Sequence, residues 1–478
     1  MDKRMLTAAA TALWIAAAGA PAQGPDAARP AGRDLGAETV TKITAPFTVA
    51  AVGDIFEPQP LYSDAAGFQS LIGVMRAADV GFANMESSLV DLRDFHGPVA
   101  GSLAPLEMGA SMRAMGITLV NHANNQALDG GLTAMVSTDE ALDRLGIVHA
   151  GTGRDLQQAR AAQFLETPKG RVGLVGMFSM DDSSNYGPNF TFSAATYRNG
   201  DLGGAPGVNA LHLTAYHIVS PDELQALARI AGNAYGGGAA NGSGAQRIKF
   251  YDEWYQAGSD GGGMHYEMNA GDERDILQSV RNGKVYADFL IVTIHSHQTS
   301  NYQALGWGGV DHTPPDFLVK LAHESIDNGA DMFIAHGVHA LRGIEIYRGK
   351  PIFYGLSSFV FQFGLQPGPS YDVLGNERGM AILESPPNQE SVLTTSRFEH
   401  GQLVEVRLYP VDLGGASRPI SQMGIPLSPS ASEARRILEE LRELSAAFGT
   451  RVVIDGNVGV IRLDPSRQGA GERSEVSR

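Results

Sequence analysis

Short apolar runs alternate with helix-like stretches from residue 46 onward, and this alternation constrains the fold more than any other feature of the chain. Residues 47–52 predict a buried strand, residues 68–77 an amphipathic helix and residues 80–84 the next strand. A β-branched run at residues 289–294 resumes the same rhythm much later. Alternation of strands and helices is typical of α/β proteins, in which helices cover both faces of the sheets.

Residues 181–285 interrupt this alternation. Glycine-rich stretches occur at 236–244 and 258–263, and the clearest helical pattern between the flanking strands lies at 221–230. We therefore expect one domain over residues 46–463 that carries an insertion of loops with one or two helices. A chain of 478 residues, 43% of them hydrophobic, is long enough to bury such a core.

The N-terminal segment has the pattern of an export signal. Basic residues at positions 3 and 4 precede an apolar stretch that ends near residue 18, and Ala20-Pro21-Ala22 offers a small-x-small cleavage site. The apolar stretch is too short to span a bilayer comfortably. We predict a cleaved signal at 1–22, a flexible linker at 23–45, a disordered tail at 464–478, and a soluble periplasmic or secreted protein.

Charge and cysteine content exclude some partners. The formal net charge is -16, which argues against a nucleic-acid backbone as a partner. An anionic substrate stays compatible with this charge, because a bound metal ion can reverse the local field. The chain has no cysteine, so it needs no disulfide and cannot be anchored through a lipidated cysteine.

Residues of metal-binding types stand directly after several predicted strands. In chain order they are Asp54, Glu86, the asparagine-rich segment 121–126, His295, and the pair His336 and His339. In open α/β sheets the functional crevice lies at the carboxyl ends of the strands, so these side chains are expected to converge. Carboxylate, amide and imidazole ligands together suit one or two ions of Zn, Mn or Fe.

Each of these segments also has an ordinary structural explanation. Asp54 after a glycine could form a turn, and the asparagines could cap a helix. His295 is more telling, since a buried histidine at a strand end costs stability unless it has a partner. His297 lies two residues further on and would share the face of His295 in an extended strand.

The segments resemble, in this order, the CapA capsule synthesis family. Its members are linked to poly-γ-glutamate synthesis and are related to calcineurin-like metallophosphoesterases. The matching stretches include AVGDIF (51–56), ANMESSL (83–89), ANNQALDGGL (123–132), DFLIVTIHSH (288–297) and residues 328–361. The resemblance implies a metallophosphoesterase-like four-layer α/β sandwich. It also implies metal-site positions at Asp54, Glu86, Asn125, His295, His336 and His339.

The chain departs from that resemblance where acid catalysis would be expected. The phosphoesterase relatives carry a histidine after the asparagine, and here that position is Gln126. A neutral glutamine can orient a group but cannot release a proton at neutral pH. His297, in a stretch where the family tends to have other residues, or His122 could compensate. The candidate catalytic residues are Asn125, Gln126 and His297, and the candidate substrate-binding residues are Asn124, Asp129 and Arg342.

The resulting expectation is an exported, metal-dependent hydrolase that acts on γ-glutamyl polymer or another envelope polymer. Its partner would be an anionic polymer or a small envelope-derived substrate. Two alternatives stay open at this point. The same site could hydrolyse phosphoesters, or the protein could be a non-catalytic module that binds polymer within a membrane synthesis complex.

Overall fold

The computed structural model describes ten stretches of the chain: 40–98, 103–181, 194–197, 203–234, 246–258, 262–301, 310–362, 386–415, 418–419 and 421–463. The predicted signal, most of the predicted linker and the predicted C-terminal tail lie outside these residues. Residues 40–45 were assigned to the flexible linker, but they lie against the fold. Thr41 and Ile43 are buried, and the Lys42 N–H donates to the Asp288 carbonyl at 2.9 Å. The folded domain therefore begins before residue 46.

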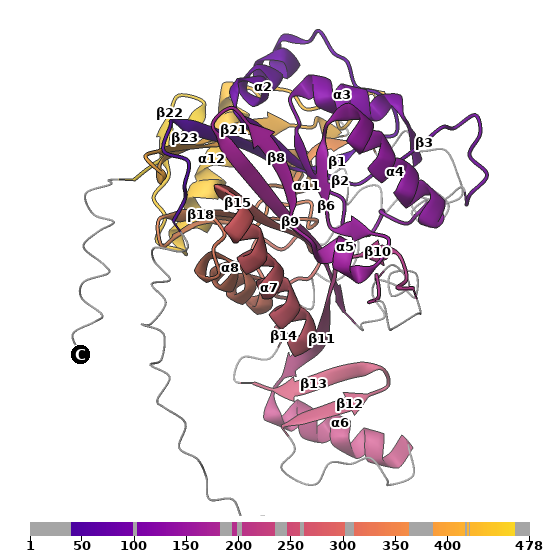
Figure 1. Cartoon of the computed structure of the whole chain (residues 1–478). Coiled ribbons are helices and arrows are strands. Elements are labelled where there is room, and N and C mark those ends of the chain that lie inside the picture. The colour runs from indigo at the N-terminus through magenta and orange to yellow at the C-terminus, as the bar shows by residue number, and fades with distance from the viewer. Residues whose placement is uncertain are drawn as a thin grey trace, which may run out of the picture. The chain divides into compact units, whose positions relative to one another are not determined.

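Two mixed sheets form the centre of the described chain (Figure 1). The first has the strand order β22-β23-β21-β20-β1-β2-β5-β6, and β19 also pairs with β1. Its strands are β1 (Phe47–Phe56), β2 (Val80–Met85), β5 (Leu119–Asn121), β6 (Val148–Ala150), β19 (Ser358–Phe361), β20 (Glu390–Glu399), β21 (Gln402–Asp412), β22 (Val453–Asp455) and β23 (Val458–Arg462). The strands β19, β1, β2, β5 and β6 run parallel, so their carboxyl ends share one edge.

The second sheet has the order β12-β13-β11-β9-β15-β16-β18-β17, with β14 on β11 and β8 on β9. Its strands are β8 (Gln163–Thr167), β9 (Gly170–Asp181), β11 (Ala210–Val219), β12 (Arg247–Phe250), β13 (Glu253–Ala257), β14 (Met264–Met268), β15 (Phe289–His295), β16 (Met332–His336), β17 (Ile344–Tyr347) and β18 (Lys350–Phe353). Strands β9, β15, β16 and β18 run parallel at its centre.

Helices cover the outer faces of both sheets, so the sandwich has four layers. The helices α2 (Ala66–Ala77), α3 (Glu107–Met115) and α4 (Gly131–Leu145) share one apolar cluster with the first sheet. The helices α7 (Ala270–Tyr286) and α8 (Asp316–Asp327) share another with the second sheet. A third cluster lies between the sheets and includes residues of α12 (Ala431–Ala446). The expected four-layer α/β sandwich is confirmed.

The sequence of β1 shows why the sheet is buried on both faces. Val49 and Ala51 point into the cluster between the sheets, whereas Ala50 and Val52 point toward the helices. Side chains alternate between the two faces of a strand, so a continuous apolar run supplies both clusters. The remaining described elements are short: β3 (Ser88–Val90), β4 (Leu103–Pro105), β7 (Thr152–Gly153), α5 (Leu156–Arg160), β10 (Gly207–Val208) and α11 (Pro386–Gln389).

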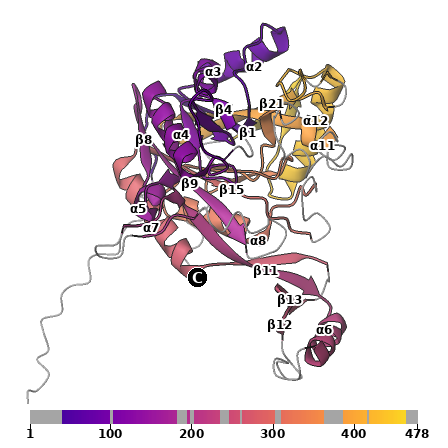
Figure 2. The same cartoon turned by 90° about the vertical axis from the view of Figure 1, so that its right-hand side faces the viewer.

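The segment 181–285 differs from the expected loops with one or two helices. It contributes β11, β12, β13 and β14 to the second sheet, together with α6 (Pro221–Ala234) and α7. Figure 2 shows β12, β13 and α6 gathered beyond the end of β11. The strands β12, β13 and β14 have only four or five residues and lie near glycine-rich stretches, which favour a loop assignment, and the ten-residue β11 was also missed. No helix among the described residues has both the length and the apolar character needed to cross a membrane.

Candidate metal centre

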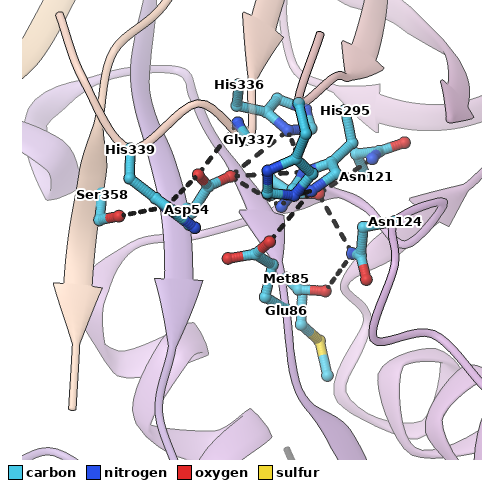
Figure 3. A network of polar contacts seen from close by, with 12 residues as sticks. Asp54, Met85, Glu86, Asn121, Asn124, His295, His336, Gly337, His339 and Ser358 are labelled. Carbon is cyan, nitrogen blue, oxygen red and sulfur yellow. Dashed lines mark hydrogen bonds and ion pairs between the residues drawn. The ribbon is translucent and has the colours of Figure 1, made fainter. Parts of the chain in front are cut away.

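The polar strand ends of the two sheets meet in one buried cluster (Figure 3). Asp54 lies in β1, beside Asn84 in β2, and both belong to the first sheet. His295 ends β15, beside His336 at the end of β16, and both belong to the second sheet. The predicted convergence of strand ends therefore holds, and it spans both sheets.

Two glycines allow the backbones to approach closely enough for this convergence. A Cβ atom on Gly53 would lie 1.7 Å from the Ser357 carbonyl oxygen. Gly337, between the two histidines of the predicted pair, has φ +110° and would place a Cβ atom 2.9 Å from the Ser296 carbonyl oxygen. His339 itself has φ 52°, an uncommon conformation for a residue with a side chain. Such strain is retained where the surrounding structure fixes it, often at functional sites.

Asp54 lies at the centre of the cluster and is fully buried. Its Oδ1 atom lies 3.4 Å from His336 Nδ1 and 3.7 Å from His295 Nδ1. Its Oδ2 atom accepts a hydrogen bond from the Gly337 N–H at 3.0 Å and lies 3.3 Å from His339 Nδ1. The two oxygens of one carboxylate thus face three imidazoles, and both residue types are common metal ligands.

Glu86 and His297 lie on the other side of His295. His295 Nε2 is 3.1 Å from Glu86 Oε1 and 2.9 Å from His297 Nε2. The second carboxylate oxygen of Glu86 is buried and has no hydrogen-bond partner among the described residues. His122, the other histidine considered for acid catalysis, instead has its Nδ1 2.8 Å from Asp139 in α4. His297 is therefore the candidate that lies in the cluster.

The buried amides of Asn84 and Asn121 support the cluster. Asn84 Nδ2 donates to Asp54 Oδ1 at 2.8 Å and lies 3.1 Å from His295 Nδ1. Asn121 donates in turn to Asn84 Oδ1 at 2.9 Å. The signal was present in the sequence, because an amide inside an otherwise apolar buried strand needs a polar partner.

The charges of the cluster depend on one another. Burial lowers the pKa of His295, but Glu86 and Asp54 outweigh it and raise that pKa to about 9. Burial lowers the pKa of His336 to about 4. Burial alone would raise the pKa of Asp54, but hydrogen bonds from the surrounding imidazoles hold it well below its usual range. Burial and the charge of Asp54 raise the pKa of Glu86. A positive charge on His295 thus compensates two buried carboxyl groups.

The remaining predicted site residues lie around this cluster. Asn125 is half-buried, and its Oδ1 atom is buried without a hydrogen-bond partner among the described residues, as is Gln126 Oε1. Asn124 donates to the Met85 carbonyl at 2.6 Å and accepts from the Gln126 N–H at 3.1 Å. Asp129 is half-buried, in the turn that follows.

Arg342, predicted to bind substrate, is buried. Its guanidinium donates to the carbonyls of Gln298 and Asp311, each at 3.0 Å. Arg342 lies shortly after the predicted histidine pair. Its two bonds therefore connect this part of the chain to Gln298, which follows His297, and to Asp311. Arg342 therefore supports the backbone that follows His297, and a direct contact with substrate stays a prediction.

The donor set fits a divalent cation. Three groups each bring their ligand atoms within 4.8 Å of one another: Asp54, His295 and His336; Glu86, His295 and His297; and Asp54, Glu86 and His339. Carboxylates and imidazoles are the ligands expected for Zn, Mn or Fe. The buried oxygens of Glu86 and Asn125 that lack a hydrogen-bond partner among the described residues are additional candidate metal ligands. Their burial costs free energy unless a cation or another polar group binds them. The cluster therefore consists of buried carboxylates and imidazoles that could hold a metal ion.

Comparison with known proteins agrees with the sequence resemblance. The family described as "Bacterial capsule synthesis protein PGA_cap" matches residues 48–363. The uncharacterized protein y4sH of Sinorhizobium fredii is 36% identical over 90% of this chain and 96% of its own length. A probable polyglutamine synthesis accessory protein of Mycobacterium tuberculosis is 24% identical over 79% of this chain and 75% of its own length. The PGA biosynthesis protein CapA of Bacillus subtilis is 36% identical over 20% of this chain and 22% of its own length.

Proposed function

This chain belongs to the PGA_cap family of bacterial capsule synthesis proteins, and from that premise we propose that it is an exported, metal-dependent hydrolase. Its substrate would be a γ-glutamyl chain or another polymer of the cell envelope, cleaved at an amide or ester bond. The observation that carries the proposal is the buried cluster in which two carboxylates and several imidazoles lie close enough to hold a metal ion together. Its members include Asp54, Glu86, His295, His336 and His339.

Different residues would hold the metal, transfer a proton and orient the leaving group. Asp54, Glu86, Asn125, His295, His336 and His339 would hold the metal. A divalent cation held there would supply Lewis acidity and an activated water at neutral pH. His297 is half-buried and adjoins His295, so it is the candidate to move a proton between the attacking water and the leaving group. Gln126 would orient the leaving group by hydrogen bonding.

Substrate recognition is proposed for the residues around Asn125. Asn124 and Asp129 flank it in the turn after β5, and Arg342 supports the segment after His297. An anionic polymer would be attracted once a cation offsets the two carboxylates of the cluster. The proposal places the protein in the periplasm or outside the cell, within or beside a membrane synthesis complex, because the N-terminal pattern predicts export.

Hydrolysis assays on the metal-loaded protein test this function. Purified protein with added Mn is incubated with a γ-glutamyl oligomer and, separately, with an aryl phosphate. We expect the oligomer to be cleaved. His297→Ala should lower turnover by about 10²-fold or more while keeping its metal, and His336→Ala should lose both. His96→Ala is the matched control, since the His96 side chain is exposed and belongs to none of the three groups that could hold a metal ion.

Two results would overturn the proposed function, and a third would change its mechanism. Cleavage of only the aryl phosphate would reassign the centre to phosphoesters, which the metallophosphoesterase-like fold also accommodates. A protein that binds polymer but takes up no metal would be a binding module. Unchanged turnover in His297→Ala would remove His297 from the mechanism.

A further inference from the structure

A groove of about 560 Å³ lies between the C-terminal part of α12 and the edge strand β22. Arg435 and Arg442 from α12 and Arg451 from the following turn line it. The described lining residues include no aspartate or glutamate. Three guanidinium groups around one groove are unexpected on a chain whose formal net charge is -16, so the groove is a local exception to the charge of the protein.

Two of these arginines have no ion-pair partner among the described residues. Arg435 is paired with Glu439, one helical turn further on, at 3.2 Å. Arg442 and Arg451 are exposed, and neither side chain forms an ion pair or hydrogen bond within the part of the chain that the structure describes. Their charges are therefore available to an anionic ligand, and guanidinium groups bind carboxylates in a bidentate manner.

The floor of the groove suits an extended chain. Strand β22 is the outermost strand of the first sheet, and it pairs only with β23 among the described strands. Val453 in β22 is 49% exposed, and Ala446 of α12 also lines the groove. An edge strand presents unpaired backbone groups to which an extended chain can add. The exposed apolar surface would cover the methylene groups of such a chain.

We propose that this groove is a second binding site, which holds an extended chain bearing carboxylates at regular spacing, such as a γ-glutamyl polymer. It shares no residue with the metal centre and lies outside residues 48–363, which match the family. The identity of the polymer rests on the proposed function, whereas the preference for carboxylates rests on the arginines. Each exposed contact contributes little by itself, so affinity would come from several carboxylates on one chain.

Binding of a labelled γ-glutamyl oligomer to the full chain tests the proposal. The charge-reversal variant Arg442→Glu with Arg451→Glu is compared with Arg113→Glu and Arg229→Glu, whose arginines are exposed on α3 and α6 without an ion pair in the described structure. Both double variants change the net charge equally. We expect the groove variant to bind about tenfold more weakly, or about 1.4 kcal/mol, and the control to bind as the parent does. Raising the salt concentration should weaken parental binding.

The outcomes separate this proposal from the proposed function. Equal binding by parent and groove variant would overturn the site, as would equal loss in the control variant. Polyphosphate that competes as well as the oligomer would overturn the preference for carboxylates. His336→Ala should lose metal but keep polymer binding. If it alone lost polymer binding, the groove proposal would fail while the metal centre stood. A parent that binds at the groove yet never cleaves would leave the groove and remove the hydrolase.

Discussion

Two buried glutamates near the ends of β1 and β2 show how surroundings decide the role of a residue. Glu86 lies next to His295 and within reach of three other donors of the cluster, so its carboxylate can serve a cation. Glu57 is equally buried, but its carboxyl group has neutral partners: the Ser111 hydroxyl, which donates to Oε1 at 2.8 Å, and the Leu61 backbone. A buried carboxyl group without a charged partner is held in its protonated form by burial.

Glu57 should therefore make stability depend on pH. Burial raises its pKa from 4.5 to about 8, even though the Ser111 hydrogen bond opposes the shift. Because the folded pKa is raised, the stabilisation is complete below pH 4.5 and is lost as the pH rises through 8. The free energy of unfolding should fall across this window with a slope of at most about 1.4 kcal/mol per pH unit.

Urea unfolding of the parent and of Glu57→Gln at several pH values measures this slope. Glutamine keeps the shape of the side chain and cannot ionise, so the variant should show a flatter dependence between pH 5 and 8, near the limits set by the two pKa values. Identical slopes in the two proteins would mean that Glu57 is not held neutral.

At the scale of elements, the turn after β16 depends on one glycine. Gly337→Ala would require a side chain at φ +110° and a Cβ atom 3.0 Å from the Ser296 backbone nitrogen. We expect a loss of about 1–3 kcal/mol in the free energy of unfolding. Gly73→Ala is the matched control, because Gly73 is exposed in α2 and a Cβ atom added there would have nothing within 4 Å. That change should raise stability by about 0.5–1 kcal/mol.

Chemical denaturation of both alanine variants distinguishes the two effects. A loss of stability at both positions would point to a general sensitivity to added methyl groups. A neutral Gly337→Ala would show that the turn can relax, and the argument for close backbone approach at the cluster would be wrong.

The sequence predicted elements well where periodicity was strong and poorly where it was weak. The apolar run of β15 and the amphipathic pattern of α2 lie within a residue or two of the predicted bounds. Strand β1 is longer than predicted and includes Asp54, because polar residues at a strand end look like a turn in sequence. The short strands β12, β13 and β14 gave no periodic signal, and their pairing with β11 and with one another is a tertiary contact.

At the scale of the whole molecule, a cation in the cluster would join the two sheets. Asp54 belongs to the first sheet, whereas His295 and His336 belong to the second. The sequence could predict the ligand types, because each follows an apolar run. It could not predict the distance between Asn84 and His295, because that distance results from packing of one sheet on the other.

Metal removal should therefore lower the melting temperature of the whole domain. A ligand that binds only the folded state stabilises it by about 2.7 kcal/mol at a concentration of about 100 times its Kd. Thermal melting with Mn or Zn, and again with a chelator, measures the shift. His336→Ala should melt at the same temperature in both conditions. A chelator effect as large in this variant as in the parent would place the bound metal elsewhere.

Metal content measured on purified protein tests the cation site most directly. The parent, Glu86→Gln and Glu57→Gln are each dialysed against Mn or Zn and analysed by elemental mass spectrometry. The parent and Glu57→Gln should retain one or two ions per chain. Glu86→Gln should retain fewer, since it loses one carboxylate donor and keeps its shape. A parent without bound metal, or a Glu86→Gln variant that binds as the parent does, would contradict the metal centre.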